Sequence, residues 1–318
     1  MEVRKVNGFF IIFVIGYIGL SVVCASIMAY AQNSGIAVPD WIQYVMSEGI
    51  ILLIAIIYMI VQKIDPIREI PYKRIGIVDV ILSLVAGYCL IPAVLLISNL
   101  SMLFSTNYLE EGTTTLLTYP FAMQVILLAV IPPLVEELIF RGIFFGSYRK
   151  AGMTGAALMS GLLFGCFHLN INQALYAFVI GIVFAYMVEA TGSLWSSVIA
   201  HFAVNTYSIG IVQILKMAGM YAQDGSVSET FENAESVAGQ STAITVVQIA
   251  MIAVIAEVFM MLAVLCIRTM AKRHGNLEKM KIQNVKLSHI KNYFTAPVIV
   301  GIVVCVMYMI MLEFSGTL

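Results

Sequence analysis

The chain has 318 residues, of which 61% are hydrophobic and only 11% are charged, and its formal net charge is −1. Because soluble domains are about half apolar and about a quarter charged, this composition excludes an ordinary soluble protein. It predicts an all-α, polytopic integral membrane bundle in the cell membrane, with about eight to nine transmembrane helices, a surrounding lipid bilayer and no nucleic-acid partner.

Apolar runs of the length that a spanning helix needs, about 20 residues, follow one another along the whole chain. The first is longer than the apolar core of a signal peptide, so we interpret it as a retained span. The candidate spans are residues 9–31, 45–62, 76–104, 118–146, 153–169, 173–190, 194–216, 243–267 and 295–314. The fifth and sixth are short, and residues 153–190 could instead form a hairpin that does not fully cross.

Basic residues gather in alternate connectors, and this asymmetry predicts the orientation of the chain. The connectors that hold every Lys and Arg except Arg141 and Lys216 are the N-terminus, 63–74, 149–150 and 268–291. The intervening connectors, 32–44, 105–117 and 217–242, are acidic or neutral. The positive-inside rule then places the N-terminus in the cytoplasm and the C-terminus outside, which requires nine crossings. We expect 268–291 to be an amphipathic helix on the anionic leaflet, or a plain solvated connector.

The cysteines all lie in apolar runs, and no CxxC pair occurs. We therefore interpret them as small buried apolar residues and expect neither a disulfide framework nor a metal site. These residues are Cys24, Cys89, Cys166, Cys266 and Cys305. No cofactor is expected.

The fourth candidate span contains three formal charges, in the stretch "PPLVEELIFRGIFF" (132–145). Ionisable groups at membrane depth cost about 2.5–3.5 kcal/mol each to insert, so they are functional candidates by default. Glu137 and Arg141 lie four residues apart on one helical face, in the order that favours an ion pair. Glu136 is rotated by about 100° and is left as a free carboxylate, which can act as a general base. Equally, all three could form one buried charge cluster that serves helix packing.

Two later spans add polar side chains at membrane depth. The stretch "FGCFHLN" places Phe164 and His168 one helical turn apart, and "AHFAVN" places His201 and Asn205 four residues apart, on one face. Two hydrogen-bond donors that converge on one point can stabilise an oxyanion. The alternative is that these residues only form hydrogen bonds between helices.

Three further acids lie within or beside the spans. Glu257 is in the middle of a span with no obvious partner, and we interpret it as protonated or as facing the core. Glu189 lies at a turn on the cytoplasmic side and is interpreted as a helix cap or a snorkelling group. Asp79 is interpreted as a polar residue at the end of a span.

The three polar patterns together resemble the CPBP (CAAX protease and bacteriocin-processing) family of intramembrane glutamic proteases. The matching motifs are EExxxR at "EELIFR" (136–141), FxxxH at "FGCFH" (164–168) and HxxxN at "HFAVN" (201–205). The sequence between the second and third motifs, with Gly-Ser-Leu at 192–194, is also similar to the family's. Each motif alone is weak, but all three in this order in a polytopic chain are specific.

The resemblance implies a metal-free hydrolysis of a peptide bond by water. Glu136 would be the general base on the attacking water, and His168 would position or polarise that water. His201 and Asn205 would stabilise the tetrahedral oxyanion. The residues that would hold the site together are Glu137, Arg141 and Phe164.

The same resemblance divides the chain into three parts. N-terminal transmembrane helices occupy 1–116, a CPBP-like catalytic helical core occupies 117–210, and C-terminal transmembrane helices with the basic cytoplasmic segment 268–291 occupy 211–318. The expected substrate is a membrane-associated peptide or protein. By family analogy alone it is a peptide precursor, such as a bacteriocin or signalling peptide.

Two other functions stay open on the sequence. A zinc-dependent membrane hydrolase could use His168, His201 and Glu136 as ligands and keep one position open, although the chain has no HExxH motif. A non-catalytic membrane scaffold or immunity factor could retain the polar cluster for packing or proton relay.

Overall fold

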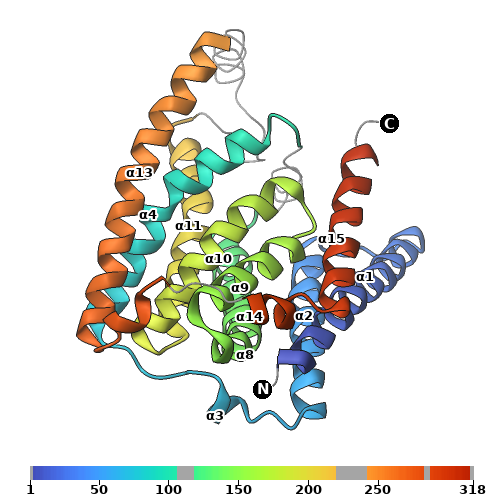
Figure 1. Cartoon of the computed structure of the whole chain (residues 1–318). Helices are drawn as coiled ribbons and strands as arrows, with labels where there is room; N and C mark the ends of the chain where they lie inside the picture. The colour runs from blue at the N-terminus through green and yellow to red at the C-terminus, as the bar shows by residue number, and fades with distance from the viewer. Residues whose placement is uncertain (1–2, 106–117, 220–241, 283–286, 316–318) are drawn as a thin grey trace.

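The computed structural model describes residues 3–105, 118–219, 242–282 and 287–315, and all regular structure within these ranges is helical. Eight of the described helices are long and apolar enough to cross a membrane. They pack side by side into a bundle (Figure 1). The expected all-α, polytopic membrane bundle is therefore confirmed.

Most of the expected spans are single continuous helices whose ends differ from expectation by a few residues. These helices are α1 (Val3–Asn33), α2 (Trp41–Val61), α4 (Ile77–Ser101), α10 (Ile171–Thr191), α11 (Trp195–Met217), α13 (Thr242–Arg273) and α15 (Ala296–Ser315). Shorter helical pieces lie in the connectors: α3 (Pro66–Glu69), η5 (Leu277–Met280) and α14 (Leu287–Tyr293).

The fifth expected span is the short helix α9 (Met153–Phe167). Its 15 residues extend about 22 Å, less than the roughly 30 Å of a hydrocarbon core. The first helix nevertheless begins at the lower end of the bundle and the last helix finishes at the upper end in Figure 1, as a path of nine passes requires.

The helices α9 and α10 form a hairpin with closely packed backbones. Leu169, in the turn between them, has a left-handed φ of 55°, and Asn170 caps α10 by accepting from the Gln173 N–H. A Cβ atom at Gly165 would lie 2.5 Å from the Ala174 carbonyl oxygen, so only glycine permits this approach. The hairpin therefore fixes the position, along the axis of the bundle, of the side chains at the C-terminal end of α9.

The fourth span is broken into short pieces: α6 (Phe121–Gln124), η2 (Val125–Val130), α7 (Ile131–Glu137), η3 (Leu138–Phe145), α8 (Gly146–Tyr148) and η4 (Arg149–Ala151). Both η2 and η3 are π-helical. Pro132 and Pro133, at the start of α7, have no N–H to donate and interrupt the α-helical hydrogen bonds there. The two wide segments flank the Glu136–Glu137 pair, and π-helical turns often occur at functional sites.

The core around this broken span is aromatic. Phe140 and Phe144 of η3 are fully buried. Phe13 of α1 stacks on Phe167 of α9 with 4.5 Å between ring centroids, and meets Phe140 edge-on at 6.2 Å. These contacts hold α1 and α9 against the segment that carries the charged motif.

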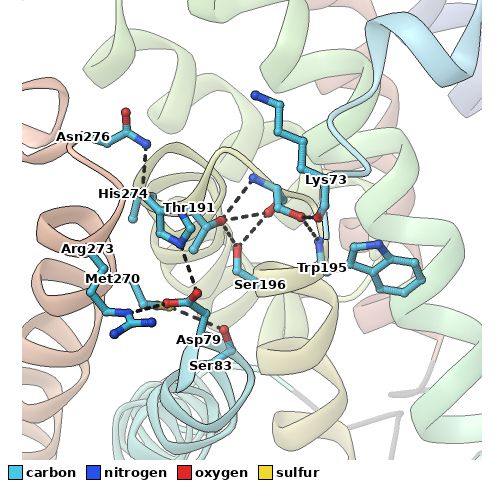
Figure 2. Close-up of polar contacts among 12 residues, drawn as sticks. Lys73, Asp79, Ser83, Thr191, Trp195, Ser196, Met270, Arg273, His274 and Asn276 are labelled. Carbon is cyan, nitrogen blue, oxygen red and sulfur yellow. Dashed lines mark hydrogen bonds and ion pairs between the residues drawn. The ribbon is translucent and has the colours of Figure 1, made fainter. Parts of the chain in front are cut away.

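The lower end of the bundle in Figure 1 brings the basic connectors together, and Figure 2 shows its polar contacts. Asp79, in the first turn of α4, is buried and accepts from Arg273 Nε at 3.2 Å and from His274 Nε2 at 3.0 Å. Asn276 donates to the Ala190 carbonyl oxygen at 3.1 Å. Asp79 is thus more than a polar residue at a span end, because it joins α4 to the end of α13.

The first of our two interpretations expected residues 268–291 to form one amphipathic helix, and they do not. The helix α13 ends at Arg273, and Gly275 follows with a left-handed φ of 67°. The Asn276 N–H bonds to the Ala271 carbonyl oxygen at 2.8 Å, and the Gly275 N–H bonds to Lys272, which is the Schellman pattern of a helix terminus. The sequence signal for this helix end is Gly275, since glycine readily adopts the left-handed conformation that terminates a helix.

The orientation of the bundle stays a prediction from the positive-inside rule. Ser193, in the α10–α11 turn, donates to the carbonyl oxygen of Lys73, so the basic connector 63–74 is held against the same end (Figure 2). The expected acidic connectors 105–117 and 217–242 lie largely outside the described residues.

Candidate active site

The centre of the candidate site is a fully buried ion pair. Arg141 Nη1 donates to Glu137 Oε1 at 2.8 Å, and neither side chain is exposed. The guanidinium carbon lies 4.3 Å from the ring centroid of Phe164 and 5.3 Å from that of Phe184. Stacking on aromatic faces favours a desolvated cation. This environment accounts for two of the three charges in the fourth span.

Gly181 makes room for this guanidinium. A Cβ atom at Gly181 would lie 2.9 Å from Arg141 Nη2 and 2.9 Å from the Cα atom of Gly161. The close approach of α9 and α10 therefore continues up to the wall of the site. Gly181 and Phe184 were not among the expected site residues, and their spacing on α10 carries no signal without knowledge of the hairpin.

His201 lies between the two glutamates. Its Nδ1 atom is 3.1 Å from Glu137 Oε1, and its Nε2 atom is 3.7 Å from Glu136 Oε2. Because Glu137 also holds Arg141, one carboxylate orients a guanidinium and an imidazole together. Only Nδ1–H can donate to an ionised carboxylate, so this contact assigns a proton to Nδ1. The Nε2 side of the ring is then turned toward Glu136.

His168 is held in a different way. Its Nδ1 atom lies 2.8 Å from the carbonyl oxygen of Phe164. A carbonyl oxygen only accepts, so the hydrogen bond requires the proton on Nδ1 and leaves Nε2 as an acceptor. The ring of Phe164 packs edge-on against both His168 and His201, with centroid distances of 4.6 and 5.8 Å. Phe164 thus links the second and third motifs as well as covering Arg141.

Asn205 bonds to the backbone of the broken span. Its Nδ2 atom donates to the Leu128 carbonyl oxygen at 3.0 Å. In an α-helix that oxygen would accept from residue 132, and in a π-helix from residue 133, but both are prolines and lack an N–H. The Asn205 side chain therefore satisfies a carbonyl that its own helix cannot.

The site divides into buried and accessible members. Glu137, Arg141, His201 and Phe164 are buried, whereas Glu136, His168 and Asn205 are partly exposed. Within the described ranges, Glu136 Oε2 is buried but has no hydrogen-bond partner. The accessible members are thus the two groups that the motifs predicted to handle water and one predicted oxyanion donor.

Glu257 and Glu189, two further acids that the sequence analysis singled out, lie outside the candidate active site. Glu257 is exposed on α13, so the interpretation that it faces the core is wrong. Glu189 is buried and ion-paired with Arg149, with Arg149 Nη2 at 2.7 Å from Glu189 Oε1, so it is an ion-pair residue of the lower end and not a helix cap.

The zinc alternative lacks a ligand set in the part of the chain that the structure describes. No group of three or more His, Cys, Asp or Glu side chains there is arranged to hold a metal ion.

Comparisons with known proteins agree with the motif resemblance. Residues 118–207 match the family model described as "Type II CAAX prenyl endopeptidase Rce1-like". The "Putative membrane peptidase YdiL" of Bacillus subtilis (strain 168) is 32% identical over 88 residues, which are 27% of this chain and 36% of that relative. No solved structure matches. The recognition of the CPBP family is thereby confirmed, over a segment that covers about a third of the curated relative's length.

Proposed function

We propose, from the premise that residues 118–207 are an Rce1-like segment, that this multi-pass membrane protein is an intramembrane endopeptidase of the glutamic type. Its substrate would be a membrane-associated peptide or protein in the cell membrane, with the N-terminus of the enzyme in the cytoplasm. The observation that carries the proposal is the partly exposed carboxyl group of Glu136, whose buried Oε2 atom has no hydrogen-bond partner among the described residues, beside the fully buried Glu137–Arg141 ion pair.

In the proposed reaction, Glu136 takes a proton from a water molecule whose oxygen attacks the carbonyl carbon of the peptide bond. The acceptor nitrogen of His168 supports this step, because it can accept the second hydrogen of the water and fix its direction. When the tetrahedral intermediate collapses, the carbon–nitrogen bond breaks and Glu136 returns the proton to the leaving amine. The water is thus divided between the two products, and Glu136 is regenerated.

The oxyanion of the intermediate would be stabilised by His201 and Asn205. Protonated on both nitrogens, His201 donates one N–H to Glu137 and the other toward the substrate. With Glu136 protonated by the attacking water, the charges of Glu137, Arg141, His201 and the oxyanion then cancel, which suits a site of low dielectric constant. Asn205 has a second N–H beyond the one that it gives to Leu128. Oriented donors of this kind typically contribute about 3–4 kcal/mol to the transition state.

The experiment is a comparison of Glu136→Gln with Glu257→Gln in the purified full-length protein, reconstituted in liposomes with membrane-associated peptides. Both variants remove one acid at membrane depth, but Glu257 is exposed on α13. Glu136→Gln should abolish cleavage, and Glu257→Gln should retain it, with similar thermal unfolding for both. Normal cleavage by Glu136→Gln would rule out the glutamic mechanism.

The other candidate functions give different outcomes. A zinc hydrolase would lose activity on treatment with a chelator and would regain it with zinc. A scaffold or immunity factor would show no cleavage with wild-type protein and would keep its biological function with Glu136→Gln.

A further inference from the structure

Glu48 is an acid of a spanning helix that neither the motifs nor the proposed mechanism uses. Glu48 lies in the middle of α2, outside the Rce1-like segment 118–207. Its Oε2 atom is buried and has no hydrogen-bond partner among the residues that the structure describes. A buried carboxylate oxygen without a partner costs several kcal/mol if it stays ionised, so its retention needs a reason.

Glu48 belongs to the same polar region as Glu136. The helix α2 packs against α7, which carries Glu136, and against the neighbouring η2. Ser47, the residue before Glu48, bonds to Tyr17 of α1 at 2.9 Å, so this turn of α2 faces the inside of the bundle. Glu136 Oε2 likewise lacks a hydrogen-bond partner. Two unpartnered carboxyl oxygens from different helices therefore share one region.

The charges of this region do not balance once Glu48 is included. Arg141 is bound to Glu137, and His201 lies between Glu137 and Glu136. These four groups can cancel one another, but no described Lys, Arg or His forms an ion pair with Glu48. If Glu48 is ionised, one negative charge is left over in apolar surroundings, where it attracts a cation strongly.

Glu48 and Glu136 are both partly exposed, while Glu137 and Arg141 are fully buried. A peptide held at Glu136 would then reach Glu48 across the contact between α7 and α2, without displacing the fully buried Glu137–Arg141 pair. An ammonium or guanidinium group on the substrate would supply the absent charge.

We propose that Glu48 is a specificity-determining residue, which binds a lysine or arginine side chain close to the scissile bond of a peptide held at Glu136. This inference rests on the proposed endopeptidase function and adds a substrate class to it: membrane-associated peptides with a basic residue beside the cleaved bond.

The test uses the full-length protein in liposomes with a library of lipid-anchored peptides whose central residues vary between lysine, norleucine and glutamate. Cleaved bonds are identified and their rates measured by mass spectrometry. The wild type should cleave lysine peptides about tenfold or more faster than norleucine peptides, in terms of kcat/KM. Glu48→Gln should bring the two rates together, and Glu48→Lys should shift the preference to glutamate.

Three further variants make the outcome decisive. Asp40→Asn removes an acid at the N-terminal end of the same helix and should leave the preference unchanged. Glu48→Asp keeps the charge and should keep the preference for lysine, which decides the question if Glu48→Gln unfolds. Glu136→Gln reports on the proposed function itself and should cleave nothing.

The two proposals fail separately. If wild type and Glu136→Gln give the same products, the endopeptidase proposal falls and the inference falls with it. If cleavage depends on Glu136 but Glu48→Gln slows all peptides equally, the endopeptidase proposal stands and Glu48 shares a proton with Glu136 or serves packing. An unchanged lysine preference in Glu48→Gln overturns the inference as well.

Discussion

The guanidinium of Arg141 is fully buried at membrane depth, in contact with the rings of Phe164 and Phe184. Its planar shape matters there, because one face stacks on an aromatic ring while an edge donates to Glu137. Lysine has the same charge but neither the flat face nor the fork of donors.

Arg141→Lys should therefore destabilise the protein by about 2 kcal/mol, the value of a desolvated cation–π contact, and lower any activity of the site. Thermal unfolding of the purified protein measures the loss. Arg68→Lys is the matched control, since Arg68 is 86% exposed and pairs with Asp65 at the surface. Equal melting temperatures for the two variants would contradict the stacking argument.

Asn205 connects two helices through the Leu128 carbonyl oxygen. Asn205→Leu should leave that oxygen without a partner and cost about 1–3 kcal/mol. The comparison is with Asn99→Leu, because Asn99 is exposed and its amide donates to the Leu95 carbonyl oxygen of its own helix. If Asn205→Leu lowers the melting temperature no more than Asn99→Leu does, the hydrogen bond to Leu128 does not stabilise the protein.

At the scale of elements, the α9–α10 hairpin carries the wall of the site. Gly181→Ala should push α10 away from Gly161 or displace Arg141, since the backbone of α9 has no freedom to give way. Gly210→Ala on α11 is the matched control, because nothing lies within 4 Å of its Cβ position. Thermal unfolding should fall for Gly181→Ala and stay equal or rise for Gly210→Ala. The reverse order would refute the steric role of Gly181.

The broken fourth span is the element that the sequence predicts least well. Its charges, its prolines and the Glu137–Arg141 pair could be inferred, because an i, i+4 pair depends only on helical spacing. The π-helical segments η2 and η3 could not, since side chains of other helices bond to their backbone carbonyl oxygens. Ser160 of α9 bonds to the Phe140 carbonyl oxygen at 2.9 Å in η3, as Asn205 does to Leu128 in η2.

For the whole molecule, the contact between Asp79 and the end of α13 joins the N-terminal and C-terminal thirds of the chain (Figure 2). Asp79→Asn should lower the melting temperature, because the buried carboxylate that accepts from both Arg273 and His274 is lost. Arg273→Gln should have a smaller effect, since Arg273 is 44% exposed and its pair is partly screened.

A double-mutant cycle of Asp79→Asn and Arg273→Gln measures this contact directly. We expect the double variant to be more stable than the sum of the single losses predicts. Additive losses would mean that the two side chains do not interact in solution.

Fold class and helix positions followed from the sequence because hydropathy and span length set them in a membrane. The contacts between side chains at membrane depth could be predicted from the sequence only in part. His201 was expected to act with Asn205, yet the structure also brings it to Glu137 and Glu136, which are 64 and 65 positions away in the chain. Such pairings depend on helix tilt and packing, which the periodicity of one helix does not report.

The bond between Asn205 and Leu128 also has a consequence for the insertion of the fourth span into the membrane. A helix that enters the bilayer must satisfy its own backbone, and this one has a carbonyl that neither Pro132 nor Pro133 can reach with a donor. The partner arrives 77 residues later, with α11. Before α11 has been synthesised, that oxygen would therefore need another donor, such as a water molecule.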